Sequence, residues 1–155
     1  MTWTVLPDTP VGPLHLTATG DALTGLRFGS GPEDGSRDPD HPVLAKVATE
    51  LSEYFAGRLR TFTVPLAPAG TPFQRSVWEQ LTLIPYGTTV SYGELARRLG
   101  SPAASRAVGL ANGRNPIAIV VPCHRVIGAD GSLTGFGGGM AAKRTLLDLE
   151  SNALF

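Results

Sequence analysis

The chain of 155 residues contains a single cysteine, Cys123. One thiol excludes a disulfide within the chain and any zinc site built from several cysteines, which suits a reducing cytoplasm. The sequence has no apolar run near the roughly 20 residues that a membrane helix needs, and its start lacks the pattern of a signal peptide. No group of histidines or acids shows metal-ligand spacing. We therefore expect a cytoplasmic protein with no membrane segment, no metal and no cofactor.

The chain also lacks a net charge, since 13 Lys and Arg balance 13 Asp and Glu. The charges are unevenly placed, however. Residues 1–70 carry five basic and eight acidic residues, a net charge of −3, and residues 71–155 carry eight basic and five acidic residues, a net charge of +3. Residues 95–125 contain five arginines and no acid. Such a stretch is compatible with a surface that contacts phosphates, although it is more often a solvated face.

The N-terminal part has the pattern of a small sheet with one helix. Alternating apolar residues bounded by glycine and proline predict three strands, with a hairpin turn at Gly20-Asp21. Apolar residues at helical spacing then predict a helix with a buried stripe of Val43, Val47, Leu51 and Phe55. The strands are expected at 2–6, 14–19 and 22–28, the helix at 43–56, a further candidate strand at 61–66, and a polar loop at 29–42.

A proline-rich joint at residues 65–72 divides the chain. We place the boundary there, with an N-terminal domain at 1–70 and a C-terminal domain at 71–155. The C-terminal part is predicted to be mainly helical, so the fold class is α+β. Its expected elements are a helix at 73–84, two short helices, a buried strand at 117–121, a glycine-dense loop at 128–139 and a helix at 141–150.

The two short helices have the pattern of a helix-turn-helix. Ser91 and Glu94 are spaced as a capping box ahead of the first helix, and Gly100 ends it. The second, at 103–111, consists of small residues with Arg106 as its only long side chain. Such a helix can approach another surface closely, but the pattern alone favours a helix that simply packs against its neighbour.

Cys123 stands in the motif P-C-H-R, directly after the apolar run. A lone cysteine in such a place is more often buried and inert. A reactive cysteine needs a base to take its proton and a third group to orient that base. His124 can be the base, through a bridging water if the two side chains point apart. The orienting acid stays open among Glu79, Glu94, Asp130, Asp148 and Glu150.

Several short motifs in register resemble one family, the O6-alkylguanine-DNA alkyltransferases. They are I-P-Y-G from residue 84, S-Y from 91, S-R-A-V-G from 105, N-P from 115, P-C-H-R-V from 122, and the glycine-rich loop after them. The resemblance covers residues 71–150. It implies an N-terminal domain with a ribonuclease-H-like antiparallel sheet, and a C-terminal domain in which the helix-turn-helix binds double-stranded DNA that carries O6-alkylguanine.

The resemblance also implies roles for single residues. Cys123 would accept the alkyl group irreversibly and once per molecule, His124 would deprotonate it through water, and Glu150 would orient His124. Tyr92 would assist the leaving guanine at N3, and Asn115 would tie the helix-turn-helix to the active-site segment. The carbonyls of Cys123 and Val126 would recognise the guanine amino group. The substrate pocket would be walled by Gly135, Phe136, Gly137 and Gly138.

The same resemblance places the second short helix in the minor groove, where Arg106 would fill the gap left by a flipped nucleotide. Ser91, Tyr92, Ala104, Ser105, Gly109 and Arg125 are the other expected DNA contacts. The protein would act as a monomer. Cooperation along DNA, the alkyl size range, activity on O4-alkylthymine and a role for the loop at 29–42 stay open.

Two departures from the family pattern stand out. The segment L-A-N-G-R from residue 110 replaces the G-A-M-R-G form, which affects local DNA contacts. Gly137 stands where some members have serine. Three other functions stay open: a related protein that binds lesions without transfer, a Cys-His hydrolase, and a transcriptional regulator that uses the helix-turn-helix. The first normally lacks the cysteine, and the last two leave part of the pattern unexplained.

Overall fold

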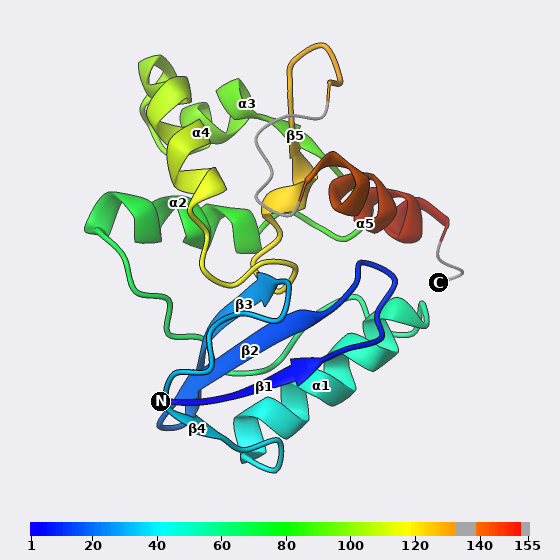
Figure 1. Ribbon diagram of the computed structural model, residues 1–155. Coiled ribbons are helices and arrows are strands. Elements are labelled where there is room, and N and C mark those ends of the chain that lie inside the picture. Colours follow the sequence, from blue (N-terminus) through cyan, green and yellow to red (C-terminus); the bar gives the residue numbers. More distant parts are fainter. Residues whose placement is uncertain (133–138, 153–155) are drawn as a thin grey trace.

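The computed structural model describes residues 1–132 and 139–152, which form a sheet-containing part and a helical part packed against each other (Figure 1). The sheet has the strand order β3-β2-β1-β4. Its strands are β1 (Thr2–Leu6), β2 (Leu14–Thr19), β3 (Ala22–Phe28) and β4 (Ser36–Arg37). Helix α1 (Pro42–Phe55) covers one face of the sheet (Figure 1). The predicted antiparallel sheet with one helix is therefore confirmed.

Strand β2 pairs with β1 on one side and β3 on the other, and its alternate apolar residues face the core. Leu14, Leu16 and Ala18 are fully buried. Gly20 turns the chain from β2 into β3 with a φ of 60°, a conformation that glycine adopts without steric cost. One feature was not predicted: the polar loop contains β4, whose two residues pair in parallel with the start of β1.

Helix α1 buries a slightly different stripe from the predicted one. Tyr54 is fully buried, and Phe55 is only half-buried. Glu50 is also buried, where its carboxylate accepts hydrogen bonds from the backbone N–H groups of Thr63 and Val64. Those N–H groups are therefore not available to a sheet. The predicted strand at 61–66 is wrong: only Leu66 makes a single bridge, to Leu23.

The helical part contains α2 (Pro72–Thr82), α3 (Tyr92–Arg98), α4 (Ser105–Gly113) and α5 (Met140–Asn152). Thr71 and Gln74 form a capping box at the start of α2. Ser91 accepts a hydrogen bond from Glu94 N and so caps α3, whereas the Glu94 side chain pairs with Arg97 and Arg98. A 3₁₀ turn, Pro102–Ala104, joins α3 to α4, which confirms the helix-turn-helix.

Residues 117–121 are buried as expected, but they do not form the predicted strand. Apart from one bridge between Ile117 and Leu26, the segment is a series of turns in which Ile119 adopts a φ of 71°. The cause is local. Asn115 accepts a hydrogen bond from Ile117 N and donates one to Val121 O, so its side chain competes with strand pairing.

The segment after the turns joins a second, two-stranded sheet. In it, β6 (Val126–Ile127) pairs in parallel with β5 (Val90–Ser91).

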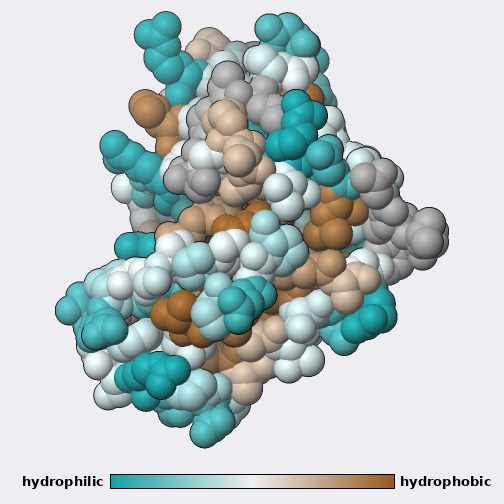
Figure 2. All heavy atoms as spheres, turned by 45° about the vertical axis from the view of Figure 1, so that its right-hand side comes forward, coloured by the Kyte–Doolittle hydropathy of each residue, from teal (hydrophilic) through white to brown (hydrophobic). Residues whose placement is uncertain are grey.

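Figure 2 shows apolar residues gathered in a band across the middle of one face of the molecule, with hydrophilic residues above and below. Within residues 1–132 and 139–152, no helix has the length and apolar character to cross a membrane.

Candidate functional site

Cys123 opens a 3₁₀ turn, Cys123–Arg125, and is 6% exposed. Two asparagines hold this segment. Asn115 donates from Nδ2 to Val121 O at 2.7 Å, and Asn112 on α4 donates from Nδ2 to Cys123 O at 3.4 Å. Asn112 is a residue that the motif analysis missed, because it occupies the segment that departs from the family pattern. Helix α4 and the residues just after it are thus tied to the cysteine segment by two hydrogen bonds.

His124 and Glu150 come together as the resemblance implied. His124 Nε2 lies 2.7 Å from Glu150 Oε2, and both side chains are buried. His124 Nδ1 is buried as well and has no hydrogen-bond partner within the described part of the chain. An ionised carboxylate only accepts hydrogen bonds, so Nε2 carries the proton of the neutral ring and Nδ1 presents a lone pair. The ring is therefore set up to accept a proton at Nδ1.

Arg125 does not occupy the position that a DNA contact requires. Its side chain is 7% exposed and makes three hydrogen bonds within the protein. Nε and Nη2 donate to the two oxygens of Glu150 at 2.8 and 2.9 Å, and Nη1 donates to Ile84 O at 2.7 Å. Its guanidinium also lies over the ring of Tyr86. A buried arginine is stable only when its charge is paired, as it is here with Glu150. Because the side chain is buried against Glu150 and does not face solvent, the prediction of Arg125 as a DNA contact is wrong.

The electrostatics of the group follow from burial and hydrogen bonding. Burial alone would raise the pKa of Glu150, but the hydrogen bonds from His124 and Arg125 prevail and lower it to about 2. Burial also lowers the pKa of His124, so the ring is neutral near pH 7. Burial raises the pKa of Cys123, against the opposing effects of a hydrogen bond from Asn115 and the charge of Lys143. The resting thiol is therefore protonated and needs a base.

Lys143 is a second residue that the sequence analysis missed. It lies on α5, is fully buried and donates from Nζ to Val126 O at 2.6 Å. The sequence could have indicated its position, because Lys143, Leu146 and Glu150 recur at helical intervals and so share one face of α5. The two carbonyls expected to recognise guanine, those of Cys123 and Val126, thus each accept a hydrogen bond from a buried side chain.

The expected DNA-contacting residues other than Arg125 lie on or beside the helix-turn-helix. Arg106 is exposed on α4, and Ala104, Ser105 and Gly109 are half-buried. Tyr92 and Ser91 are half-buried at the start of α3. A Cβ at Gly109 would lie 3.7 Å from Tyr92 Cδ1, an ordinary van der Waals distance, so Gly109 lies directly against the Tyr92 ring.

The predicted pocket wall lies partly outside the described residues. The part that lies outside them consists of Gly135, Phe136, Gly137 and Gly138. Val126 is described, and it is buried next to the cysteine turn. Among the described residues, no group of three or more His, Cys, Asp or Glu side chains is placed to hold a metal ion.

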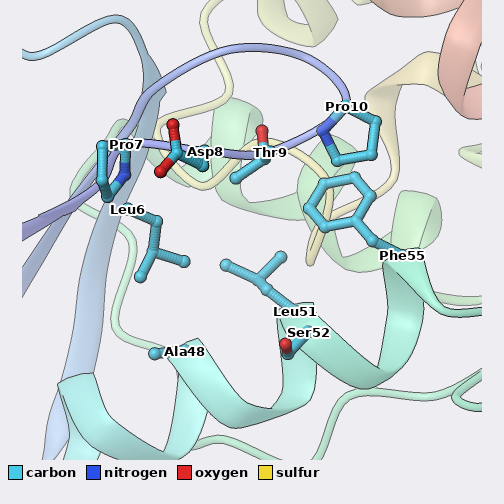
Figure 3. A pocket seen from close by; sticks show the side chains of 9 residues that line it. All are labelled: Leu6, Pro7, Asp8, Thr9, Pro10, Ala48, Leu51, Ser52 and Phe55. Atoms are coloured by element: carbon cyan, nitrogen blue, oxygen red, sulfur yellow. The ribbon is translucent and has the colours of Figure 1, made fainter.

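Two cavities differ in how close they come to this site. One, of about 290 Å³, is lined by both parts of the molecule and reaches Arg125 and Tyr86. The other, of about 230 Å³, lies between α1 and the loop after β1 (Figure 3). Pro7, Pro10 and Phe55 line it, and none of its lining residues belongs to the cysteine site.

A helix-turn-helix joined to a buried cysteine, histidine and glutamate defines a class: a DNA-binding α+β protein with a reactive thiol. Two family models match this chain. One, described as 6-O-methylguanine DNA methyltransferase, DNA binding domain, matches residues 72–152. The other, described as the ribonuclease-like domain of the same protein, matches residues 1–68. The chain therefore belongs to the 6-O-methylguanine DNA methyltransferase family, as the sequence motifs indicated.

Individual relatives agree along nearly the whole chain. The methylated-DNA–protein-cysteine methyltransferase of Mycobacterium tuberculosis H37Rv is 53% identical over 148 residues, covering 94% of this chain and 90% of the relative. The protein of that name from Methanosarcina acetivorans is 48% identical and covers 94% and 96%. A crystal structure of the M. tuberculosis OGT in complex with DNA superimposes with a TM-score of 0.91, at 49% identity, and covers 99% and 94%.

Proposed function

We propose that this protein repairs DNA by direct reversal, transferring the alkyl group of O6-alkylguanine in double-stranded DNA to its own Cys123. One observation carries the proposal. The only cysteine is joined to a DNA-binding fold by Asn112 and Asn115, and its neighbour His124 is held by Glu150 with one ring nitrogen left to accept a proton.

The transfer begins with the proton of the Cys123 thiol. His124 Nδ1 accepts it through a water, and Glu150, ionised because of its low pKa, stabilises the imidazolium that forms. The thiolate then attacks the alkyl carbon. The new S–C bond forms as the C–O6 bond breaks, and the electron pair of the broken bond goes to the guanine.

The leaving guanine needs help because negative charge builds up on it as the bond breaks. We assign this role to Tyr92, whose hydroxyl donates to N3. The carbonyls of Cys123 and Val126 accept hydrogen bonds from the guanine amino group. In the structure without DNA, Cys123 O accepts hydrogen bonds from Asn112 Nδ2 and Val126 N, and Val126 O accepts one from Lys143 Nζ.

DNA is bound through the minor groove by helix α4. The half-buried small residues Ser105 and Gly109 of α4, with Ala104 just before it, allow close approach, and the exposed Arg106 fills the space of the flipped nucleotide. Flipping is required because a thiolate that is 6% exposed cannot reach a substituent inside the stacked duplex. Ser91 is a further DNA contact in this proposal. The protein acts on DNA as a monomer, in the cytoplasm.

Each molecule acts once. The thioether on Cys123 is stable, and the sequence contains no second thiol that could remove the alkyl group. The protein is consumed as a stoichiometric reagent.

The test is the intact mass of the protein after it is mixed with duplex DNA carrying one O6-methylguanine, followed by peptide mapping. We expect a gain of one methyl group in place of hydrogen on Cys123, saturating at one per molecule. Cys123→Ser is the control, and it should bind the DNA without a change in mass. Tight binding by the native protein with no mass change would instead identify a protein that recognises lesions without repairing them. Repeated turnover of an ester would identify a hydrolase.

A further inference from the structure

The hydroxyl of Tyr54 reaches the proposed active site from the other part of the molecule. Tyr54 lies on α1, is fully buried, and donates from its hydroxyl to Glu150 Oε2 at 2.7 Å. The same oxygen accepts the hydrogen bond from His124 Nε2, also at 2.7 Å. The two donors therefore share one acceptor, although Tyr54 and Glu150 are 96 residues apart in the sequence.

The remaining contacts of the Glu150 carboxylate come from the C-terminal part. Arg125 binds both oxygens, with Nε at 2.8 Å from Oε1 and Nη2 at 2.9 Å from Oε2, and Gly87 N lies 3.4 Å from Oε1. Arg125 anchors the carboxylate as a charge. Tyr54 adds a neutral donor on the oxygen that faces the histidine.

The Tyr54 ring is fixed by its neighbours, so the hydroxyl has little freedom. Its centroid lies 5.3 Å from that of Phe55, 5.4 Å from that of Phe62 and 6.2 Å from that of Tyr86. Burial and the negative charge of Glu150 both raise the pKa of the Tyr54 hydroxyl, so it keeps its proton. It therefore acts as a permanent hydrogen-bond donor.

We propose that Tyr54 is a positioning residue for alkyl transfer, whose hydroxyl holds Glu150 Oε2 and limits how strongly this oxygen draws a proton onto His124. The inference rests on the function proposed above. A carboxylate with fewer donors is more basic and stabilises a neighbouring imidazolium more strongly. With the Tyr54 hydroxyl in place, His124 stays neutral at lower pH and remains able to accept the thiol proton.

Other groups around the carboxylate also bear on its charge. His124 and Cys123 lie on the 3₁₀ turn, and Lys143 lies on the same helix as Glu150. The titratable and charged groups that face this centre are His124, Arg125, Cys123, Lys143, Tyr86 and Tyr54, with Arg60 beyond Tyr86. Tyr54→Phe leaves all the others in place and removes one oxygen.

The experiment measures the single-turnover rate of methyl transfer from duplex DNA between about pH 5.5 and about pH 9. In Tyr54→Phe we expect the midpoint of the acid limb to move to higher pH by about half a unit or more, because His124 is then protonated at higher pH. DNA affinity should stay within about twofold. The matched control is Thr17→Val, which removes a hydroxyl from the sheet, where it bonds to Thr24 at 3.1 Å, and should leave the profile unchanged.

A structural role would give a different result. A rate lowered by the same factor at every pH, or a profile that superimposes on that of the native protein, would overturn the inference. A second comparison uses Glu150→Gln as the background: if Tyr54 acts through Glu150, adding Tyr54→Phe should shift the profile no further. An additional shift there would also overturn it. The proposed function is judged separately, by whether the native protein gains a methyl group on Cys123.

Discussion

At the scale of the residue, the surroundings of Cys123 act on its proton in opposite directions. Burial favours the neutral thiol, whereas Lys143 and Asn115 favour the thiolate. Lys143 is itself fully buried, and its ammonium group donates to Val126 O. A buried charge near a thiol acts on it with little screening by water. Lys143 therefore holds the backbone at Val126 in place, and its positive charge lowers the pKa of the Cys123 thiol.

We expect Lys143→Met to make Cys123 harder to ionise. The variant keeps most of the side-chain volume but removes the positive charge, so the pKa of the thiol should rise. The measurement is the rate of alkylation by a small reagent such as iodoacetamide as a function of pH, without DNA. The midpoint should move to higher pH in Lys143→Met. The exposed Arg144, one position along α5, provides the control: Arg144→Met should leave the midpoint unchanged.

At the scale of the element, helix α4 presents one exposed face and buries the other. Val108 and Ala111 pack inward, and Trp78 on α2 donates from Nε1 to Ala111 O at 2.9 Å, which fixes α4 on the helical part. On the outer face, Arg106 and Leu110 are one helical turn apart, and Leu110 is 63% exposed. Leu110 is thus an exposed apolar side chain beside Arg106, on the face of α4 that we propose binds DNA.

Arg106→Ala is expected to lower the single-turnover transfer rate on duplex DNA by roughly tenfold or more. The proposed role of Arg106 is to occupy the place of the flipped base, and without it the flipped state costs more free energy. Transfer from a single-stranded oligonucleotide should change much less, because no base pair has to be opened. Arg58→Ala is the control, since Arg58 is exposed and paired with Glu53 in the N-terminal part, away from the arginine-rich stretch at 95–125. An equal loss on both substrates would contradict the proposed role.

At the scale of the whole molecule, Glu150 is one place where the two parts meet through polar contacts. Its carboxylate accepts from Tyr54 of α1 and from His124 and Arg125 of the cysteine turn. The N-terminal part also reaches the cysteine segment directly, where Leu26 pairs with Ile117. The N-terminal part is thus built into the support of the proposed active site.

Glu150 also makes the stability of the folded chain depend on acid. Its pKa is lowered from 4.5 to about 2, so its contribution is fully present above about pH 4.5 and is lost as the pH falls through about 2. The shift corresponds to roughly 3 kcal/mol of unfolding free energy. Urea unfolding between about pH 6 and about pH 3 should therefore show the native protein and Glu150→Gln converging toward low pH. Glu79→Gln, at an exposed glutamate of α2, should run parallel to the native protein.

The sequence by itself determined most of the elements and the family. Apolar periodicity placed the three main strands and the helices, because a buried face leaves a regular pattern. The motif around Cys123, with its companions in register, identified the family and the pairing of His124 with Glu150. The domain boundary between residues 70 and 71, and the catalytic and DNA-contact roles other than that of Arg125, stay predictions.

Only the tertiary structure decided the rest, because it depends on partners far apart in the chain. Glu50 takes the backbone N–H groups of Thr63 and Val64, so a sequence with strand propensity forms no strand. Arg125 has the sequence context of a DNA contact, yet Glu150, 25 residues later, draws it into the interior. Tyr54 fits the helical stripe as well as Phe55 does, and only the packing of α1 against the helical part shows that its hydroxyl meets the carboxylate.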